Sequence, residues 1–451
     1  MATITVASNS STDVQTAINA ASAGDIVQLL ATSASWAALS VTCNKAITIQ
    51  GVSTAAPANP TKGCGVSSTI IDVTGTPGNS SANVTFNITK QAGGLTRIKG
   101  IKFTLTDNGG EQHPINIDGG WLTARPVIWD NCEFVCDGGT MMDSHVAGGV
   151  IFSHCTFTGL WNDFFLTVKD LFSDAVTYSW HTADSMGMND TTGEKNIYVE
   201  SSKFNGGANG VFDADDNSRF VDRHNEYNNC GGFNSHGWDT SPYGCRHFEI
   251  YENDYNFVVD PANGGQGQFQ KPYSGGSYSN NVNFYMWLRG ATGVIFNNAM
   301  DDIYSTAWGD KFEMHATIRG IEDNIGSAGG PFPGGCGTVV YPCPHQLGQN
   351  NNGTSDFTDP IYVWGNTGTL WNPSYPNVWG SSNFSAWGNQ CGLADYNDWW
   401  QSGRDYILSG GDGKGATAKP GYTAYTYPHP LVADTPDTGT SGYGKGRPTM
   451  A

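Results

Sequence analysis

A short pattern recurs along this chain and limits the folds open to it. Each copy has a pair of apolar residues, a few polar residues, a small or amide residue, one spacer and a closing aromatic. The copies are VIWDNCEF (127–134), VIFSHCTF (150–157), IYVESSKF (197–204), FVDRHNEY (220–227) and FEIYENDY (248–255), with GVIFNNAM (293–300) as a degenerate copy. A fixed repeat of this kind indicates a solenoid.

The closing residues indicate a period of about 23 residues. Phe134 and Phe157 lie 23 positions apart, and so do Phe204 and Tyr227. The gap of 47 from Phe157 to Phe204 is read as about two periods, as is the gap of 45 that follows Tyr255. The copies are rich in β-branched and aromatic residues and are separated by Gly, Asn, Asp and Ser, so each is predicted to be a coil of short strands.

The residue two places before each closing position is predicted to point inward and form a ladder. Equivalent positions on neighbouring coils lie about 4.8 Å apart, so an inward Asn can hydrogen-bond to its counterpart on the next coil. Cys132 and Cys155 could form a disulfide there or remain a column of free thiols. The ladder positions are Cys132, Cys155, Ser202, Asn225, Asn253 and Asn298.

Composition narrows the function classes. The formal charge is −19 and only 14% of the residues are charged, so the surface should repel nucleic acid. No run of 18 apolar residues exists, which argues against a membrane span. The cysteines form no metal-type CxxC pattern; Cys132/Cys136, Cys230/Cys245 and Cys336/Cys343 are near enough in sequence to bridge in an oxidising compartment.

The start of the chain carries a family resemblance. Residues 11–22 predict a short amphipathic helix with Thr12 or Asp13 as N-cap, lying over the first coil. The run DVQTAINAASAGDIVQL (13–29), followed by AITIQG (46–51), resembles the opening of right-handed parallel β-helix proteins of the pectate-lyase-like superfamily. The segments at 246–253 and 288–298 are similar to those of uncharacterised bacterial β-helix proteins. The superfamily includes polysaccharide lyases, glycoside hydrolases, esterases and phage tailspikes, so the resemblance implies the fold more than the reaction.

These patterns predict an all-β chain in three parts. Residues 1–45 are read as an N-terminal cap with the first strands, and 46–330 as a right-handed parallel β-helix with about 23 residues per coil. Residues 331–451 are read as a last coil and an irregular tail rich in Trp, Gly and Pro, packed on the solenoid. No leader of basic and then apolar residues follows Met1, so we expect a secreted protein whose signal peptide was removed or a protein of the virion surface. A homo-oligomer or a virion assembly is a further possibility.

The stretch 212–253 is the densest in Arg, His and acidic residues, and the period predicts that Asp213 lies beside His236 and Arg223 beside Arg246. The resemblance implies a lyase that abstracts a proton beside the carboxylate of a uronic acid, with Arg or Lys as base and Ca²⁺ or a second Arg neutralising that carboxylate. The candidate bases are Arg223, Arg246 and Lys271, the candidate Ca²⁺ ligands are Asp213, Asp215 and Asp216, and His236 and Asp239 complete the catalytic candidates.

Two alternatives remain open. Asp215-Asp216 followed by His236-Gly237, with Asn189-Asp190-Thr191 upstream, is similar to the motif order of polygalacturonase-like hydrolases, although Ser235 stands where the motif has Gly and no RxK follows. The other alternative is a structural or glycan-binding surface protein without catalysis, such as a virion decoration or spike. The residues predicted to contact sugar are Arg219, Arg289, Trp238, Tyr243, Tyr251, Tyr285 and Trp287. The sequence thus favours a carbohydrate-active protein, lyase-like on acidic polysaccharide.

Overall fold

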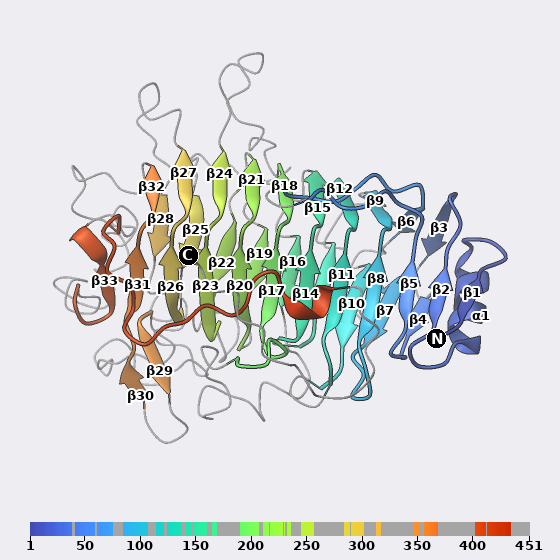
Figure 1. Cartoon of the computed structure of the whole chain (residues 1–451), viewed down its shortest axis with the longest axis horizontal. Coiled ribbons are helices and arrows are strands. Elements are labelled where there is room, and N and C mark those ends of the chain that lie inside the picture. The colour runs from blue at the N-terminus through green and yellow to red at the C-terminus, as the bar shows by residue number, and fades with distance from the viewer. Residues whose placement is uncertain are drawn as a thin grey trace, which may run out of the picture.

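Three long parallel sheets make up most of the molecule (Figure 1). The computed structural model describes residues 1–37, 41–58, 61–74, 84–106, 114–120, 124–137, 141–146, 148–159, 165–168, 190–206, 211–215, 217–228, 230, 232–235, 245–256, 284–288, 290–301, 313–316, 347–351, 356–368, 402–411 and 413–433. Within these residues the sheets have 12, 10 and 9 strands, and neighbouring strands in each run parallel.

The strands are short, mostly of three to five residues. In order of pairing, the twelve-stranded sheet contains β1 (Thr3–Thr5), β2 (Ile26–Gln28), β5 (Thr48–Gln50), β8 (Thr96–Lys99), β11 (Val127–Asp130), β14 (Val150–Ser153), β17 (Ile197–Glu200), β20 (Arg219–Arg223), β23 (His247–Tyr251), β26 (Thr292–Phe296), β31 (Ile361–Trp364) and β33 (Tyr406–Leu408). The ten-stranded sheet contains β3 (Ser33–Ala37), β6 (Ile70–Thr74), β9 (Lys102–Thr106), β12 (Glu133–Asp137), β15 (Thr156–Gly159), β18 (Lys203–Asn205), β21 (Glu226–Asn228), β24 (Asp254–Asn256), β27 (Ala299–Asp301) and β32 (Thr367–Gly368).

The nine-stranded sheet contains β4 (Val41–Cys43), β7 (Phe86–Thr89), β10 (Ile115–Asp118), β13 (Met142–Ser144), β16 (Leu166–Val168), β19 (Phe212–Ala214), β22 (Phe233–Ser235), β25 (Phe284–Leu288) and β28 (Glu313–Ala316). Two further strands, β29 (Gln349–Asn351) and β30 (Asp356–Thr358), pair antiparallel. From β2 to β27 the chain visits the twelve-, ten- and nine-stranded sheets in turn. This order is consistent with a parallel β-helix.

The spacing of successive passages is less regular than the single period that the sequence predicts. Phe157 pairs directly with Phe204, so the 47 positions between them make one passage through the three sheets. Tyr255 likewise pairs with Met300, 45 positions further on. The interpretation of these gaps as two periods was wrong, because the strand pairing makes each gap a single passage through the three sheets. The predicted period does hold from β11 to β14 and from β17 to β20.

The predicted ladder is confirmed, and it follows a sharp turn. The Oδ1 atoms of Asn225 and Asn253 each accept the backbone N–H of the ladder residue one passage earlier, both at 2.8 Å. Asn298 continues the series at 3.1 Å, and Asn366 extends it at 3.0 Å. The residue before each ladder position has a positive φ, as at Ser201 with 51°, which turns the chain out of the twelve-stranded sheet and aims the next side chain into the interior.

The closing aromatics stack in the same interior. Phe157 and Phe204 lie 4.5 Å apart between ring centroids, and Tyr227 lies 4.7 Å from both Phe204 and Tyr255. These rings are buried, and the stacking adds to the hydrophobic stabilisation of each passage on the next. Cys132, Cys155, Cys230 and Cys245 are buried thiols that form no disulfide, and Cys136 is buried as well. The pair Cys336/Cys343 lies outside the described residues.

An α-helix lies at the N-terminal end of the stack (Figure 1). It is α1 (Ser11–Ala20), and it buries Val14, Ala17 and Ile18. Its N-cap is Ser10, not Thr12 or Asp13, and the Ser10 hydroxyl accepts the N–H of Asp13 at 3.2 Å. In the described part of the chain no helix is long and apolar enough to cross a bilayer.

Candidate functional site

A C-terminal segment, residues 417–433, crosses the outer face of the twelve-stranded sheet. We call it the C-terminal strap; it runs from β31 back to β8 across the strands (Figure 1). Lys419 contacts Asp359 near the strap's start, and the Tyr422 hydroxyl donates to Glu249 of β23 at 2.5 Å. Near its end lies the short 3-10 helix η9 (Pro430–Val432); a second one, η8 (Ser409–Gly411), follows β33.

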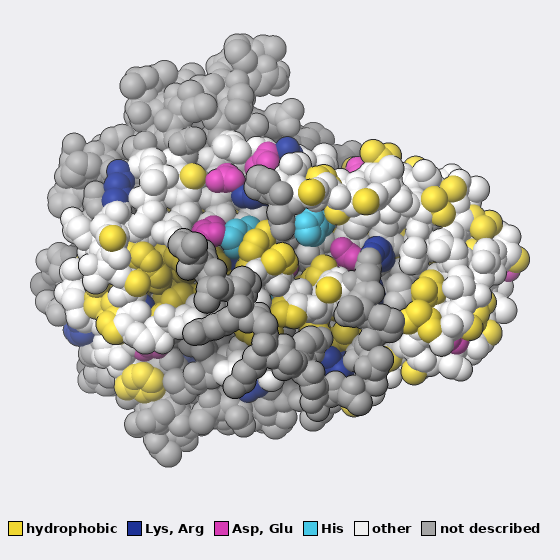
Figure 2. Space-filling model, in the orientation of Figure 1, with side chains coloured by type: hydrophobic (Ala, Val, Ile, Leu, Met, Phe, Trp, Pro, Cys, Tyr) yellow, Lys and Arg dark blue, Asp and Glu magenta, His cyan; other side chains and the backbone are white. Residues whose placement is uncertain are grey.

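Apolar side chains of the sheet lie under the strap. The outward column Ile128, Ile151, Tyr198, Val221 and Val294 forms one buried cluster with strap residues around Leu431. Figure 2 shows hydrophobic side chains along the path of the strap. A sheet whose outer face carries such a column needs a cover, because contiguous exposed apolar surface favours association.

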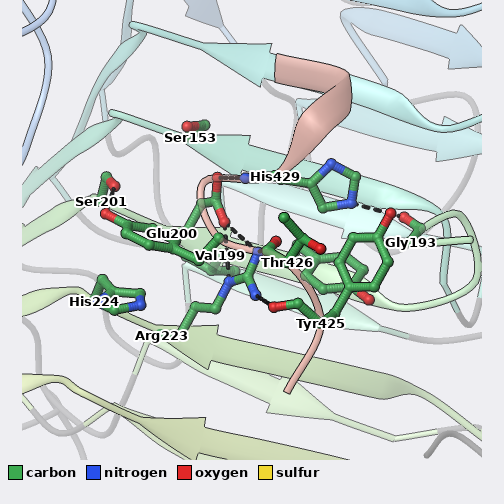
Figure 3. Close-up of polar contacts among 12 residues, drawn as sticks. Ser153, Gly193, Val199, Glu200, Ser201, Arg223, His224, Tyr425, Thr426 and His429 are labelled. Atoms are coloured by element: carbon green, nitrogen blue, oxygen red, sulfur yellow. Dashed lines mark hydrogen bonds and ion pairs between the residues drawn. The ribbon is translucent and has the colours of Figure 1, made fainter. Parts of the chain in front are cut away.

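A polar cluster also lies under the strap (Figure 3). The Arg223 guanidinium donates to Glu200 Oε2 from Nη2 at 2.6 Å and from Nε at 3.0 Å. The same guanidinium donates to two strap carbonyls, that of Tyr425 at 2.7 Å and that of Thr426 at 2.9 Å. The Glu200 carboxylate accepts the His429 N–H at 2.8 Å. An ion pair in the sheet therefore holds the strap through its main chain.

Burial and pairing set the electrostatics of this cluster. The Arg223 and Glu200 side chains are both 0% exposed. Burial by itself lowers the pKa of Arg223, but the Glu200 carboxylate and the Tyr251 hydroxyl outweigh it, so the pKa lies above its usual value. Burial lowers the pKa of His429 to about 4. At neutral pH the cluster thus contains one fixed ion pair and a neutral imidazole, an arrangement suited to holding the strap.

A second segment, residues 61–66, reaches the same place from the N-terminal side. Gly63 N–H donates to the Ser201 carbonyl at 2.9 Å, and the Ser201 hydroxyl bonds the Tyr427 hydroxyl of the strap at 2.7 Å. Lys62 pairs with Asp254 at 2.6 Å. The two segments are joined at Ser201, although they come from opposite ends of the chain.

A different cluster lies where the nine-stranded sheet leads into the twelve-stranded sheet. This corner cluster consists of Asp213, Asp215, Asn217, Arg219, Arg246 and His247, all buried. Arg219 Nη1 donates to the Asn217 carbonyl at 2.9 Å. Burial and the neighbouring Arg246 lower the pKa of Arg219 well below its usual value. Two guanidinium groups close together in the interior are a feature of anion recognition as well as of structural networks.

The strand pairing gives Arg223 and Asp213 different neighbours from those expected from the repeat period. Arg223 lies beside Tyr251, not Arg246, because the passage from β20 to β23 is longer than that period. Asp213 lies beside Asn234, which donates to its carboxylate at 2.9 Å. The predicted juxtaposition of Arg223 and Arg246 was wrong, because the passage between their strands is longer than the period and this shifts the register. His236, the predicted neighbour of Asp213, lies outside the described residues.

The predicted site residues therefore divide into four groups. Arg223 and Tyr251 lie under the strap, where Tyr251 stacks on Phe296 at 4.5 Å, and Asp213, Asp215, Arg219 and Arg246 belong to the corner cluster. Trp287 and Tyr285 lie in β25. Asp216, His236, Trp238, Asp239, Tyr243, Lys271 and Arg289 lie outside the described residues. Among the described residues, no group of three His, Cys, Asp or Glu side chains is arranged to hold a metal ion, and Ca²⁺ binding stays a prediction.

An ordered row of polar side chains lies on the outer face of the ten-stranded sheet. Its members are in register on β15, β18, β21 and β24. Asn228 Nδ2 donates to Asn205 Oδ1 at 3.0 Å, Asn256 Nδ2 donates to Asn228 Oδ1 at 3.3 Å, and Asn205 Nδ2 donates to Thr158 Oγ1 at 3.4 Å. We call Thr158, Asn205, Asn228 and Asn256 the amide column; all four are partly exposed.

Comparison with known proteins leaves the family open. No protein-family model matches the sequence, and no curated protein matches it.

Glu200 and the amide column were not predicted from the sequence, although the repeats contained the signal. Glu200 occupies the position of Arg223 one copy earlier, so aligned copies place the two charges side by side. Asn205, Asn228 and Asn256 each follow a closing aromatic directly. His429 could not have been found in this way, because its contact with Glu200 spans 229 positions outside the repeat.

Proposed function

We propose that this chain is a right-handed parallel β-helix of the pectate-lyase-like kind that binds polysaccharide along the outer face of its ten-stranded sheet. The observation that carries the proposal is the amide column. Its carboxamide groups can both donate and accept hydrogen bonds, and they recur at the strand spacing of about 4.8 Å along the stack. A linear polymer of sugar rings presents hydroxyl groups at repeated intervals, which suits such a row.

The described candidate bases support a binding role over a catalytic one. Arg223 is enclosed by Glu200, Tyr251 and the strap, and Arg246 is fully buried. A general base must come within hydrogen-bond reach of the proton that it removes. Binding along the amide column requires no displacement of either residue.

Affinity electrophoresis in gels containing single polysaccharides tests this proposal. Retardation of the native protein should be lost in Asn205→Leu and Asn228→Leu, because each change removes an amide of the column. The matched control is Asn19→Leu, the same change on the exposed face of α1. Equal retardation of all four proteins, or of none, would refute binding at this face.

A second candidate, β-elimination of acidic polysaccharide, is supported by the corner cluster. The guanidinium groups of Arg219 and Arg246 could together neutralise a uronate carboxylate, as that reaction requires. Because both side chains are buried, the reaction requires that the corner cluster opens to admit the polymer. The test is the absorbance of unsaturated ends during incubation with uronate polymers, with and without Ca²⁺. Arg246→Lys should reduce the rate strongly, since Lys cannot bind a carboxylate in the two-pronged manner of Arg. New reducing ends without that absorbance would instead support hydrolysis.

The predicted location, outside the cell or on a virion, is tested by fractionating the native source. Recovery in the culture supernatant or in purified particles would support it. Recovery in the cytosol alone would contradict it.

A further inference from the structure

The charges beside the amide column are matched in pairs. The neighbouring outward positions of the ten-stranded sheet include Lys102, Glu133, Lys203 and Glu226. Lys102 Nζ lies 2.9 Å from Glu133 Oε1, and Lys203 Nζ lies 2.8 Å from Glu226 Oε1. Figure 2 shows basic and acidic side chains next to one another over β18, β21 and β24. Each of these lysines is therefore already held by a carboxylate of the protein.

The 61–66 segment adds a third pair on the same face. Lys62 Nζ lies 2.6 Å from Asp254 Oδ2 and also donates to the Asn225 carbonyl at 2.9 Å. A polymer carboxylate would have to compete with Asp254 for this ammonium group. It would also approach a protein whose formal charge is −19, and like charges repel at the distances of close contact.

The amide column itself lies close to these pairs. Asn228 Nδ2 donates to Glu226 Oε1 at 2.8 Å as well as to Asn205. The column thus presents neutral amides backed by carboxylates, which attract hydroxyl donors and repel anions. Hydroxyl groups are what a neutral sugar offers along its whole length.

We propose that the amide column binds a neutral, linear polysaccharide that lies along the stack, across the strands, and that it discriminates against uronate polymers. This inference rests on the proposed function and specifies its substrate class. Successive sugar rings along the stack meet successive members of the column, so affinity should rise with chain length from a disaccharide to about a tetrasaccharide, the length that the four members span.

Calorimetric titration with cellohexaose, mannohexaose and hexagalacturonate tests the proposal at low salt. At least one neutral hexasaccharide should bind about tenfold or more tightly than hexagalacturonate, the difference expected from loss of one net hydrogen bond together with charge repulsion. The disaccharide of the same series should bind more weakly. Asn228→Leu should abolish binding, whereas Asn19→Leu should not change it, with circular dichroism confirming that both variants fold.

The double variant Glu133→Gln/Glu226→Gln tests whether the charge of the two carboxylates, and not the shape of the surface, excludes uronate polymers. It frees Lys102 and Lys203 from their carboxylates while keeping side-chain size, so binding of hexagalacturonate should increase and the increase should fall with added salt. Tighter binding of hexagalacturonate than of both neutral hexasaccharides by the native protein, lost in Asn228→Leu, would overturn the neutral class and leave the proposed function standing. Binding of none of the three, or binding unaffected by Asn228→Leu, would overturn both.

Discussion

Replacement of Arg223 by Met should release the C-terminal strap. The variant keeps an unbranched side chain of similar length but removes the guanidinium that joins Glu200, Tyr251 and two strap carbonyls. Glu200 would remain fully buried with its charge uncompensated. Removal of one partner of a buried ion pair typically costs about 3–5 kcal/mol, which corresponds to a roughly 10²- to 4 × 10³-fold increase in the population of the opened strap.

Chymotrypsin cleavage after Tyr425 measures that population, because the Tyr425 carbonyl is held by Arg223 in the closed strap. When opening is fast relative to cleavage, the cleavage rate follows the opening equilibrium. Arg223→Met should therefore be cut roughly 10²-fold or more faster than the native protein. Lys102→Met, which breaks a surface ion pair with Glu133 that is about one-quarter exposed on each side, should change the rate less than about fivefold.

A second substitution, at Glu200, tests whether its uncompensated charge causes the strap to open. Adding Glu200→Gln to Arg223→Met removes the uncompensated charge, so the double variant should be cut more slowly than Arg223→Met alone. Equal cleavage rates of Arg223→Met and the native protein would refute the role of Arg223 in holding the strap closed. Faster cleavage of the double variant than of Arg223→Met would refute the electrostatic explanation of that role.

Three further predictions concern pH and the interior. Burial raises the pKa of Asp222 from 3.8 to about 7, although the hydrogen bonds from Tyr227 and Asn225 act in the opposite direction. Between these two pH values the native protein keeps a proton that the unfolded chain releases, so the free energy of unfolding should fall by about 4 kcal/mol as the pH rises from about 4 to 7. Asp222→Asn should remove this loss in urea titrations. Burial lowers the pKa of His429 from 6.5 to about 4. The opened strap binds a proton that the closed strap excludes, so the free energy that holds the strap closed should fall by about 3 kcal/mol as the pH falls through this range. The change should appear as faster hydrogen exchange of the strap amides, and it should be absent in His429→Phe. Asn253→Ala removes the side chain that bonds the Asn225 N–H and the Asp222 carbonyl. It should lower the free energy of unfolding in urea by roughly 2–4 kcal/mol, whereas Asn256→Ala on the exposed face should lower it by less than about 1 kcal/mol. Equal losses in the two variants would contradict the role of the ladder.

The inward ladder is a feature that the local sequence pattern predicts. Asn225, Asn253 and Asn298 occur at one repeat position after a turn, and strand alternation dictates which side of the sheet each faces. The sequence therefore predicts their shared column and the parallel β architecture without knowledge of the loops. The helix α1 was predicted from its apolar spacing in the same way, although its N-cap lies at Ser10.

The neighbours of particular side chains depend on the length of every excursion. The passage from β20 to β23 is longer than the repeat period, and this places Tyr251, not Arg246, beside Arg223. The same repeat copies do bring Glu200 next to Arg223, because the passage from β17 to β20 keeps the period. Register within a passage can thus be read from the sequence only where no insertion intervenes.

The amino-acid pattern alone determined the repeated strands and the polar ladder in the interior, since each depends on residues a few positions apart. Only the tertiary structure decided that the strap covers the outer face and that Arg223 holds Tyr425, 202 positions away. Such a contact has no local signature: a buried charge needs a partner, and which distant segment supplies it is settled when the chain returns across the sheet.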